Sequence, residues 1–132
     1  MAHNVVVAVI TKELGDKVAY LLISSKKNFG EYTGYYYPPG GHMEDGETEE
    51  ETLIRELNEE LGLQIKPIEK ITTTGGDVKD QVTHWWRCQI DGGELHKNDT
   101  EIADANFFTQ EQMKTMNIWP ATRKFFEDFI FL

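Results

Sequence analysis

Cysteine and positive charge are both scarce in this chain of 132 residues. The single cysteine, Cys88, excludes an internal disulfide and supplies no thiolate cluster for zinc, so we expect it to be buried and inert. Lysine and arginine number 13 against 23 aspartates and glutamates, which gives a net charge of −10. A chain this acidic lacks the basic surface that long DNA or RNA requires.

Long apolar runs are also missing. Residues 5–10 form an apolar segment that is too short to span a bilayer, and the basic region of a secretory signal does not precede it. We therefore expect no membrane partner and a cytoplasmic location. The length predicts one domain, residues 1–132, that is large enough to bury a hydrophobic core.

Negative charge is concentrated in one segment, residues 44–60, which holds nine carboxylates and a single arginine. This segment alone carries a charge of −8. Like charges at this density repel one another and favour disorder unless a cation offsets them. The same segment nevertheless carries the signals of a stable helix, and the combination indicates a divalent metal ion.

An amphipathic helix is predicted over residues 49–61. Thr48 and Glu51 have the spacing of a capping box, and Gly62 is suited to a C-terminal cap. Apolar residues recur at helical spacing and form one stripe, made up of Leu53, Ile54, Leu57 and Leu61. The beginning, the buried face and the end of the helix are therefore all specified locally.

Three carboxylates share the face opposite this stripe. Glu56, Glu59 and Glu60 are spaced i, i+3 and i+4, so their side chains meet over one patch. Clustered hard oxygen ligands suit Mg²⁺ or Mn²⁺, whereas the alternative interpretation is a solvated acidic face. The preceding residues 38–41, Pro-Pro-Gly-Gly, form a stiff approach whose glycines allow backbone carbonyls close to a metal ion or a ligand.

The segment from Gly41 to Leu63 resembles the Nudix box, G-x5-E-x7-R-E-U-x-E-E-x-G-U, in which U is a bulky apolar residue. Every defined position matches without a gap over these 23 residues, about a sixth of the chain. The resemblance implies an α/β fold, specifically an α/β/α sandwich with a mixed β-sheet and a loop–helix–loop that carries the box.

Hydrophobic patterns in the rest of the chain agree with that fold class. Strands are predicted over residues 5–11, 18–24, 65–74, 81–90 and 106–109. We expect the first two to form a hairpin around the turn at residues 14–17. A second capping box begins a short helix at Thr109, and Pro120 precedes a terminal helix over residues 121–131.

The resemblance also implies a chemistry, the hydrolysis of a nucleoside diphosphate linked to a further group by attack of water on phosphorus. Mg²⁺ is the expected cofactor, with Mn²⁺ as the alternative. Carried over by position, Glu59 and Glu60 are metal ligands, and Glu56 is a ligand or the general base. Arg55 would orient a neighbouring carboxylate, and Glu47 would brace the loop. The carbonyl of Gly41, or of Gly40, would add a ligand.

Family members often use a further acid from a later loop, and Glu101 lies in the expected region. Glu94, Asp99 and Asp104 compete with it. For substrate binding, His42 and a nearby cation (Lys26, Lys27 or Arg87) are candidates to contact phosphate. Several aromatic residues are candidates to stack on a base, against the alternative that they belong to the core. They are Phe29, Tyr35, Tyr36, Tyr37, Trp85, Trp86 and Trp119.

A nucleoside triphosphate, in its normal or oxidised form, is the leading substrate. ADP-ribose, nucleotide sugars and dinucleoside polyphosphates are the alternatives, and dimers are common in the family, so a homodimer is a further expected partner. Two other classes stay open: a nucleotide-sensing Nudix domain without catalysis, and a cation-buffering or interaction module. Turnover with Mg²⁺ would distinguish the enzyme from both.

Overall fold

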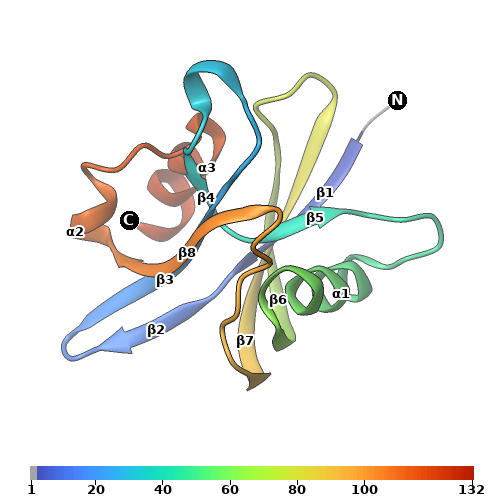
Figure 1. The fold of residues 1–132 in the computed structure, drawn as a ribbon, viewed down its shortest axis with the longest axis horizontal. Helices are drawn as coiled ribbons and strands as arrows, with labels where there is room; N and C mark the ends of the chain where they lie inside the picture. Colours follow the sequence, from blue (N-terminus) through green and yellow to red (C-terminus); the bar gives the residue numbers. More distant parts are fainter. Residues whose placement is uncertain (1–2) are drawn as a thin grey trace.

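Two β-sheets lie between helices in the computed structural model, which describes residues 3–132 (Figure 1). Within these residues, one sheet has the strand order β5-β1-β7-β6, and the other has the order β2-β3-β4 with β8 paired to β3. The strands are β1 (His3–Val9), β2 (Thr11–Leu14), β3 (Lys17–Ser25), β4 (Tyr36–Tyr37), β5 (Gly40–His42), β6 (Leu63–Gly75), β7 (Gln81–Gly93) and β8 (Ile102–Thr109). The helices are η1 (Gly30–Tyr32), α1 (Glu49–Leu61), α2 (Gln110–Met113), α3 (Pro120–Phe125) and the π-helical turn η2 (Phe126–Ile130).

Alternation along β1 divides the core into two halves. Val6 and Ala8 face a cluster that includes the apolar face of α1, whereas Val7 and Val9 face a cluster that includes α3 and η2. In Figure 1, α1 and α3 accordingly lie on opposite sides of the strands. β1 pairs with β7 in parallel and with β5 in antiparallel orientation, so the expected α/β/α arrangement with mixed strand pairing is confirmed.

Helix α1 occupies the predicted residues 49–61. The Thr48 side chain accepts from the Glu51 N–H, the Glu51 side chain accepts from the Thr48 N–H, and Gly62 ends the helix in a left-handed conformation at φ 66°. Its fully buried apolar residues are Leu53, Leu57 and Leu61. The expectation that Ile54 belongs to this stripe is wrong. Ile54 is 46% exposed, because the buried arc of α1 is narrower than the apolar pattern and is completed by Thr52.

The predicted hairpin also needs correction. β1 ends at Val9, and the chain then crosses to the second sheet, where β2 rather than β1 pairs with β3. The Ile10 carbonyl accepts from the Leu21 N–H at 3.0 Å at this crossing. The apolar run ends at Ile10, but Thr11 is β-branched and has high strand propensity, so the sequence extends one predicted strand across the point where the structure changes sheets.

The C-terminal third follows the predictions with shifted boundaries. β8 begins at Ile102, four residues earlier than expected, because it runs along most of β3. Pro120 occupies the first turn of α3, and the helical path continues through η2 to Ile130. Cys88 is buried as expected, and burial raises the pKa of its thiol to about 12.

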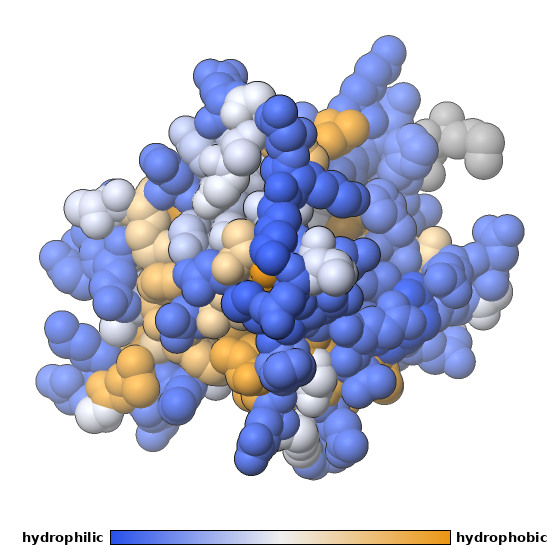
Figure 2. All heavy atoms as spheres, in the orientation of Figure 1, coloured by the Kyte–Doolittle hydropathy of each residue, from blue (hydrophilic) through white to orange (hydrophobic). Residues whose placement is uncertain are grey.

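The distribution of polar side chains on the surface agrees with the concentration of charge in residues 44–60. On the face shown in Figure 2, the region of α1 is almost wholly hydrophilic, and apolar side chains show mainly over β2, β3 and β8. None of the described helices is long and apolar enough to cross a membrane.

Packing of α1 gives the first prediction. Leu57→Ala removes a fully buried side chain and should lower the free energy of unfolding by about 2–5 kcal/mol. Ile54→Ala, the matched control on the same helix, should change it by less than about 0.5 kcal/mol. Urea unfolding followed by circular dichroism measures both. Equal losses in the two variants would contradict this assignment of the buried face.

Candidate metal and nucleotide site

Arg55 and Glu47 form a bidentate ion pair that ties α1 to the loop before it. Arg55 Nε donates to Glu47 Oε2 at 2.7 Å, and Arg55 Nη2 donates to Glu47 Oε1 at 2.9 Å. Glu47 Oε1 also accepts from the backbone N–H of Glu44 and from the Thr52 hydroxyl, both at 2.9 Å. The hydrogen bonds from Arg55 lower the pKa of Glu47 to about 2, so this carboxylate stays ionised and engaged.

The same guanidinium reaches three further carboxylates and a carbonyl, and the first of these carboxylates is Glu44, whose Oε1 lies 3.6 Å from Arg55 Nη1. Arg55 Nη1 donates to Glu56 Oε1 at 2.9 Å and lies 3.4 Å from Glu59 Oε2, and Arg55 Nη2 donates to the His42 carbonyl at 3.2 Å. These partners, Glu47 first, raise the pKa of Arg55. One cation therefore joins the loop, β5 and the acidic face of α1 in a single network.

Glu60 lies outside this network. Its Oε2 is buried and has no hydrogen-bond partner among the described residues. Burial, followed by the charge of Glu56, raises the pKa of Glu60 to about 8, and burial likewise raises the pKa of Glu56. The backbone of Gly41 packs directly against Glu56, since a Cβ at Gly41 would overlap that carboxylate. Two crowded carboxyl groups, one with an unsatisfied oxygen, need either a shared proton or a cation.

The donor set fits a divalent cation of the magnesium type. No three acidic, histidine or cysteine side chains within residues 3–132 converge as a ready-made cage. Mg²⁺, however, is usually held by one or two carboxylates and completes its shell with waters and substrate phosphates. Glu60 and Glu56 provide such a pair, with the Gly41 backbone alongside. Glu59 is 57% exposed beside Arg55, and Glu101 is near enough for its charge to raise the pKa of Glu60.

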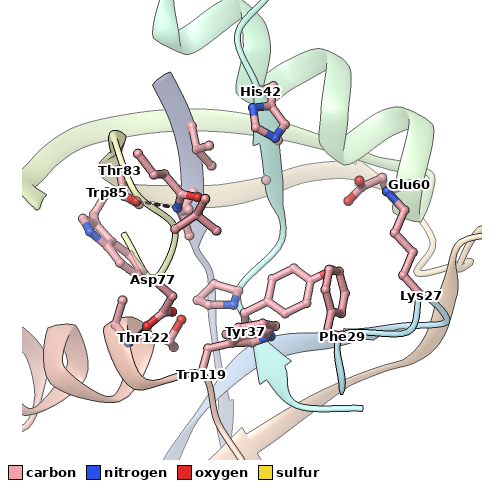
Figure 3. A pocket seen from close by; sticks show the side chains of 18 residues that line it. Lys27, Phe29, Tyr37, His42, Glu60, Asp77, Thr83, Trp85, Trp119 and Thr122 are labelled. Atoms are coloured by element: carbon pink, nitrogen blue, oxygen red, sulfur yellow. Dashed lines mark hydrogen bonds between the residues drawn. The ribbon is translucent and has the colours of Figure 1, made fainter. Parts of the chain in front are cut away.

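A cavity of about 400 Å³ opens beside Glu60. Its walls come from β1, β5, β7, the loop after β3, the β6–β7 turn and the beginning of α3 (Figure 3). Among the predicted substrate-binding residues, His42 and Tyr37 line this cavity, and so does Trp85. Trp85 is only 2% exposed, and one face of its ring is already stacked on Phe125 with centroids 3.8 Å apart.

Arg87 is not brought to the cavity. It lies on an exposed part of β7, where its Nε donates to Glu69 Oε1 at 3.0 Å. The cation that does line the cavity is Lys27, and in Figure 3 its side chain extends toward Glu60. From the sequence, Lys26, Lys27 and Arg87 were equivalent candidates to contact phosphate. Which of them lies near residues 41–63 depends on how the strands pair, and the sequence does not show this pairing.

Three further residues line the cavity, and two of them, Phe29 and Trp119, are among the aromatic residues that the sequence indicated as candidates to stack on a base. Phe29 and Trp119 meet edge to face with centroids 5.4 Å apart, and Trp119 also stacks on Tyr32 at 4.9 Å. Asp77, which the sequence marked only as part of a Gly-Gly-Asp turn, lines the end of the cavity next to α3.

Comparison with known proteins identifies the family. A family model described as the NUDIX domain matches residues 1–129, so the chain belongs to the MutT-like Nudix hydrolase family. Members of this family typically depend on a divalent metal ion, and their substrates are small nucleotide derivatives.

Two curated relatives and one solved structure illustrate which proteins this chain resembles in sequence and in fold. Putative nudix hydrolase 1 of Caenorhabditis elegans is 31% identical over 128 residues, which cover 93% of this chain and 33% of that protein. Nucleoside triphosphatase NudI of Enterobacter sp. (strain 638) is 30% identical over 118 residues, which cover 80% of this chain and 83% of that protein. A NUDIX hydrolase from Nitrosomonas europaea matches the fold with a TM-score of 0.79 at 23% identity, covering 97% of this chain and 88% of that one. The chain spans about a third of the length of the first of these relatives.

The raised pKa of Glu60 gives a prediction for the protein in chelator. The folded state keeps a proton on Glu60 up to about pH 8, whereas the unfolded chain loses it near its ordinary value of 4.5. This group therefore favours folding below pH 4.5, and its contribution is lost as the pH rises through 8. Urea unfolding at several pH values should show a decline between about pH 5 and 8 that Glu60→Gln makes shallower. Identical slopes in the two proteins would contradict the burial of this carboxyl group.

Proposed function

We propose that the chain is a Mg²⁺-dependent pyrophosphohydrolase whose substrate is a nucleoside triphosphate, in its normal or oxidised form. The observation that carries the proposal is the unpartnered, buried oxygen of Glu60 beside Glu56, at the edge of a cavity with aromatic walls. The carboxylate pair, whose charge a cation would offset, lies next to a cavity with aromatic walls that suit a base. A nucleoside polyphosphate needs both features side by side, one for its phosphates and one for its base. The match to the nucleoside triphosphatase NudI over most of both chains supports this substrate class.

Glu60, Glu56 and Glu59 would hold the metal, together with the carbonyl of Gly41 and the carboxylate of Glu101, whose charge raises the pKa of Glu60. Mn²⁺ is the alternative ion for the same oxygen donors. A bound divalent cation supplies charge neutralisation for the phosphate oxygens and lowers the pKa of a water molecule. Glu60 and Glu56 would be the central pair of ligands, because the charge of a bound cation would offset their mutual repulsion.

The protein residues themselves orient the reacting groups. Arg55 holds Glu56 by a hydrogen bond of 2.9 Å, so the Glu56 carboxylate has a fixed direction, and Glu47 in turn fixes Arg55. As the oxygen of water bonds to phosphorus, the bridging P–O bond breaks and the proton of water passes to a carboxylate. Glu56 serves either as that base or as a ligand, and Glu59 is the second carboxylate within reach of Arg55.

Lys27 and His42 would meet the phosphates at the Glu60 end of the cavity. Tyr37 and Phe29, with Trp119 behind them, provide the flat apolar walls on which a base would lie. The orientation of the substrate follows: phosphates toward Glu60 and the base toward the aromatic residues.

The experiment is a hydrolysis assay with a panel of nucleoside triphosphates, oxidised nucleoside triphosphates, ADP-ribose, nucleotide sugars and dinucleoside polyphosphates, each with Mg²⁺ and with chelator. Mg²⁺-dependent release of pyrophosphate from triphosphates supports the proposal. Turnover confined to another group would overturn the substrate class. Nucleotide binding without any turnover would overturn the enzymatic assignment in favour of a sensor.

Two conservative substitutions test the metal ligands. Glu59→Gln and Glu60→Gln should each lower kcat by at least about 100-fold, because each removes a charge that balances the metal while keeping the shape of the side chain. Thermal unfolding should show that both variants remain folded. Glu50→Gln is the matched control, since Glu50 is an exposed glutamate on the first turn of the same helix. Rates near wild type in both Glu59→Gln and Glu60→Gln would refute the ligand assignment.

A further inference from the structure

The cavity is chemically different at its two ends. In Figure 3, Glu60 and Lys27 lie at one end and Asp77 and Thr122 lie at the other, with Tyr37, Phe29 and Trp119 between them. Glu60 and Asp77 are the two carboxylate residues among those that line the cavity. A ligand whose phosphates are held at the Glu60 end therefore presents its opposite end, the base, to Asp77.

Asp77 is held in place from one side only. It follows β6 in the turn that leads to β7, and its Oδ1 accepts from the backbone N–H of Ala121 at 3.0 Å, which joins this turn to the beginning of α3. Its second oxygen has no hydrogen-bond partner among residues 3–132. Asp77 is exposed in the open wall of the cavity, so its second oxygen is accessible to a ligand, and desolvation of the carboxyl group by the surrounding wall raises its pKa.

An ionised carboxylate accepts hydrogen bonds and donates none. Guanine presents a ring N–H and an amino group side by side, and adenine and cytosine each present one amino group. Uracil and thymine present a single N–H between two carbonyl oxygens, which a carboxylate repels. A carboxylate at the base end of a pocket therefore ranks bases by the N–H groups on the edge that faces it.

We propose that Asp77 is a specificity-determining residue, which accepts hydrogen bonds from N–H groups of the nucleobase and disfavours bases that present carbonyl oxygens. The proposal rests on the proposed function for the orientation of the ligand. It concerns recognition of the base and leaves the hydrolytic chemistry at Glu60 unchanged. Ala121 and Asp77 together would then set the distance between the base edge and α3.

Asp77→Asn is the discriminating substitution. The asparagine Oδ1 can still accept from Ala121, so the turn stays attached to α3, while the second oxygen becomes an amide that donates. Asp80→Asn is the matched control. Asp80 lies in the same turn, does not line the cavity, and has φ 64°, a conformation that asparagine tolerates. Both variants lose one negative charge.

The first readout is binding of guanosine and uridine monophosphates, which contain no diphosphate bond, followed by fluorescence or NMR titration. Wild type and Asp80→Asn should bind the guanosine compound at least about tenfold more tightly, the scale of one charge-assisted hydrogen bond. Asp77→Asn should reduce or reverse this ratio by about tenfold. The second readout is the ratio of kcat/KM for guanosine and uridine triphosphates, which should shift in the same direction.

The outcomes separate this inference from the hydrolase proposal. Turnover with the same base ratio in wild type and Asp77→Asn would overturn the role of Asp77 and leave the enzyme intact. A base preference in binding that Asp77→Asn reverses, without any turnover, would support Asp77 and overturn the enzyme. Equal binding of guanosine and uridine monophosphates by wild type would overturn the inference, whether or not the variant folds.

Discussion

Repulsion among the carboxylates of α1 is the constraint that shapes this part of the molecule. The helix carries six glutamates and one arginine, and Arg55 contacts Glu56 and Glu59 on the helix as well as Glu47 and the His42 carbonyl beyond it. A single guanidinium can satisfy only part of this charge. Glu60 is left with a buried, unpartnered oxygen, and its pKa rises to about 8. The unsatisfied charge is thereby concentrated at one point, on the edge of the cavity.

The rest of the fold holds that point next to the cavity that we propose accommodates the remainder of the ligand. β5 lies so close to β1 that a side chain at Gly40 would overlap the Val6 carbonyl. Because Gly40 has no side chain, the segment that leads into the Nudix box can run along the edge of the sheet. The loop after β3 adds Lys27 and Phe29, and the β6–β7 turn adds Asp77. Because these segments are far apart in sequence, the proposed metal end and the proposed base end of the cavity can vary independently within one scaffold.

How far the sequence could predict this arrangement depended on how local each signal was. The limits of α1, its caps and the ordering of its carboxylates follow from contacts within a few residues, and they could be predicted. The crossing between sheets at Ile10 was not predicted, because the β-branched Thr11 continues the strand propensity past the end of the apolar run. Ile54 could not be placed, since helical periodicity gives a face but not its buried width. Arg87 and Lys27 looked equivalent until the strand register separated them, and Asp77 had no pattern of its own.

The proposed roles of the cavity residues all depend on a divalent cation site at Glu60 and Glu56. The most direct test is a crystal of the protein soaked in Mn²⁺, with the ion located by its anomalous scattering. We expect a peak about 2 Å from a carboxylate oxygen of Glu60, with oxygens of Glu56 or the Gly41 carbonyl in the coordination shell of the ion. An ordered Mn²⁺ bound elsewhere, with Glu60 protonated and paired to Glu56, would contradict it.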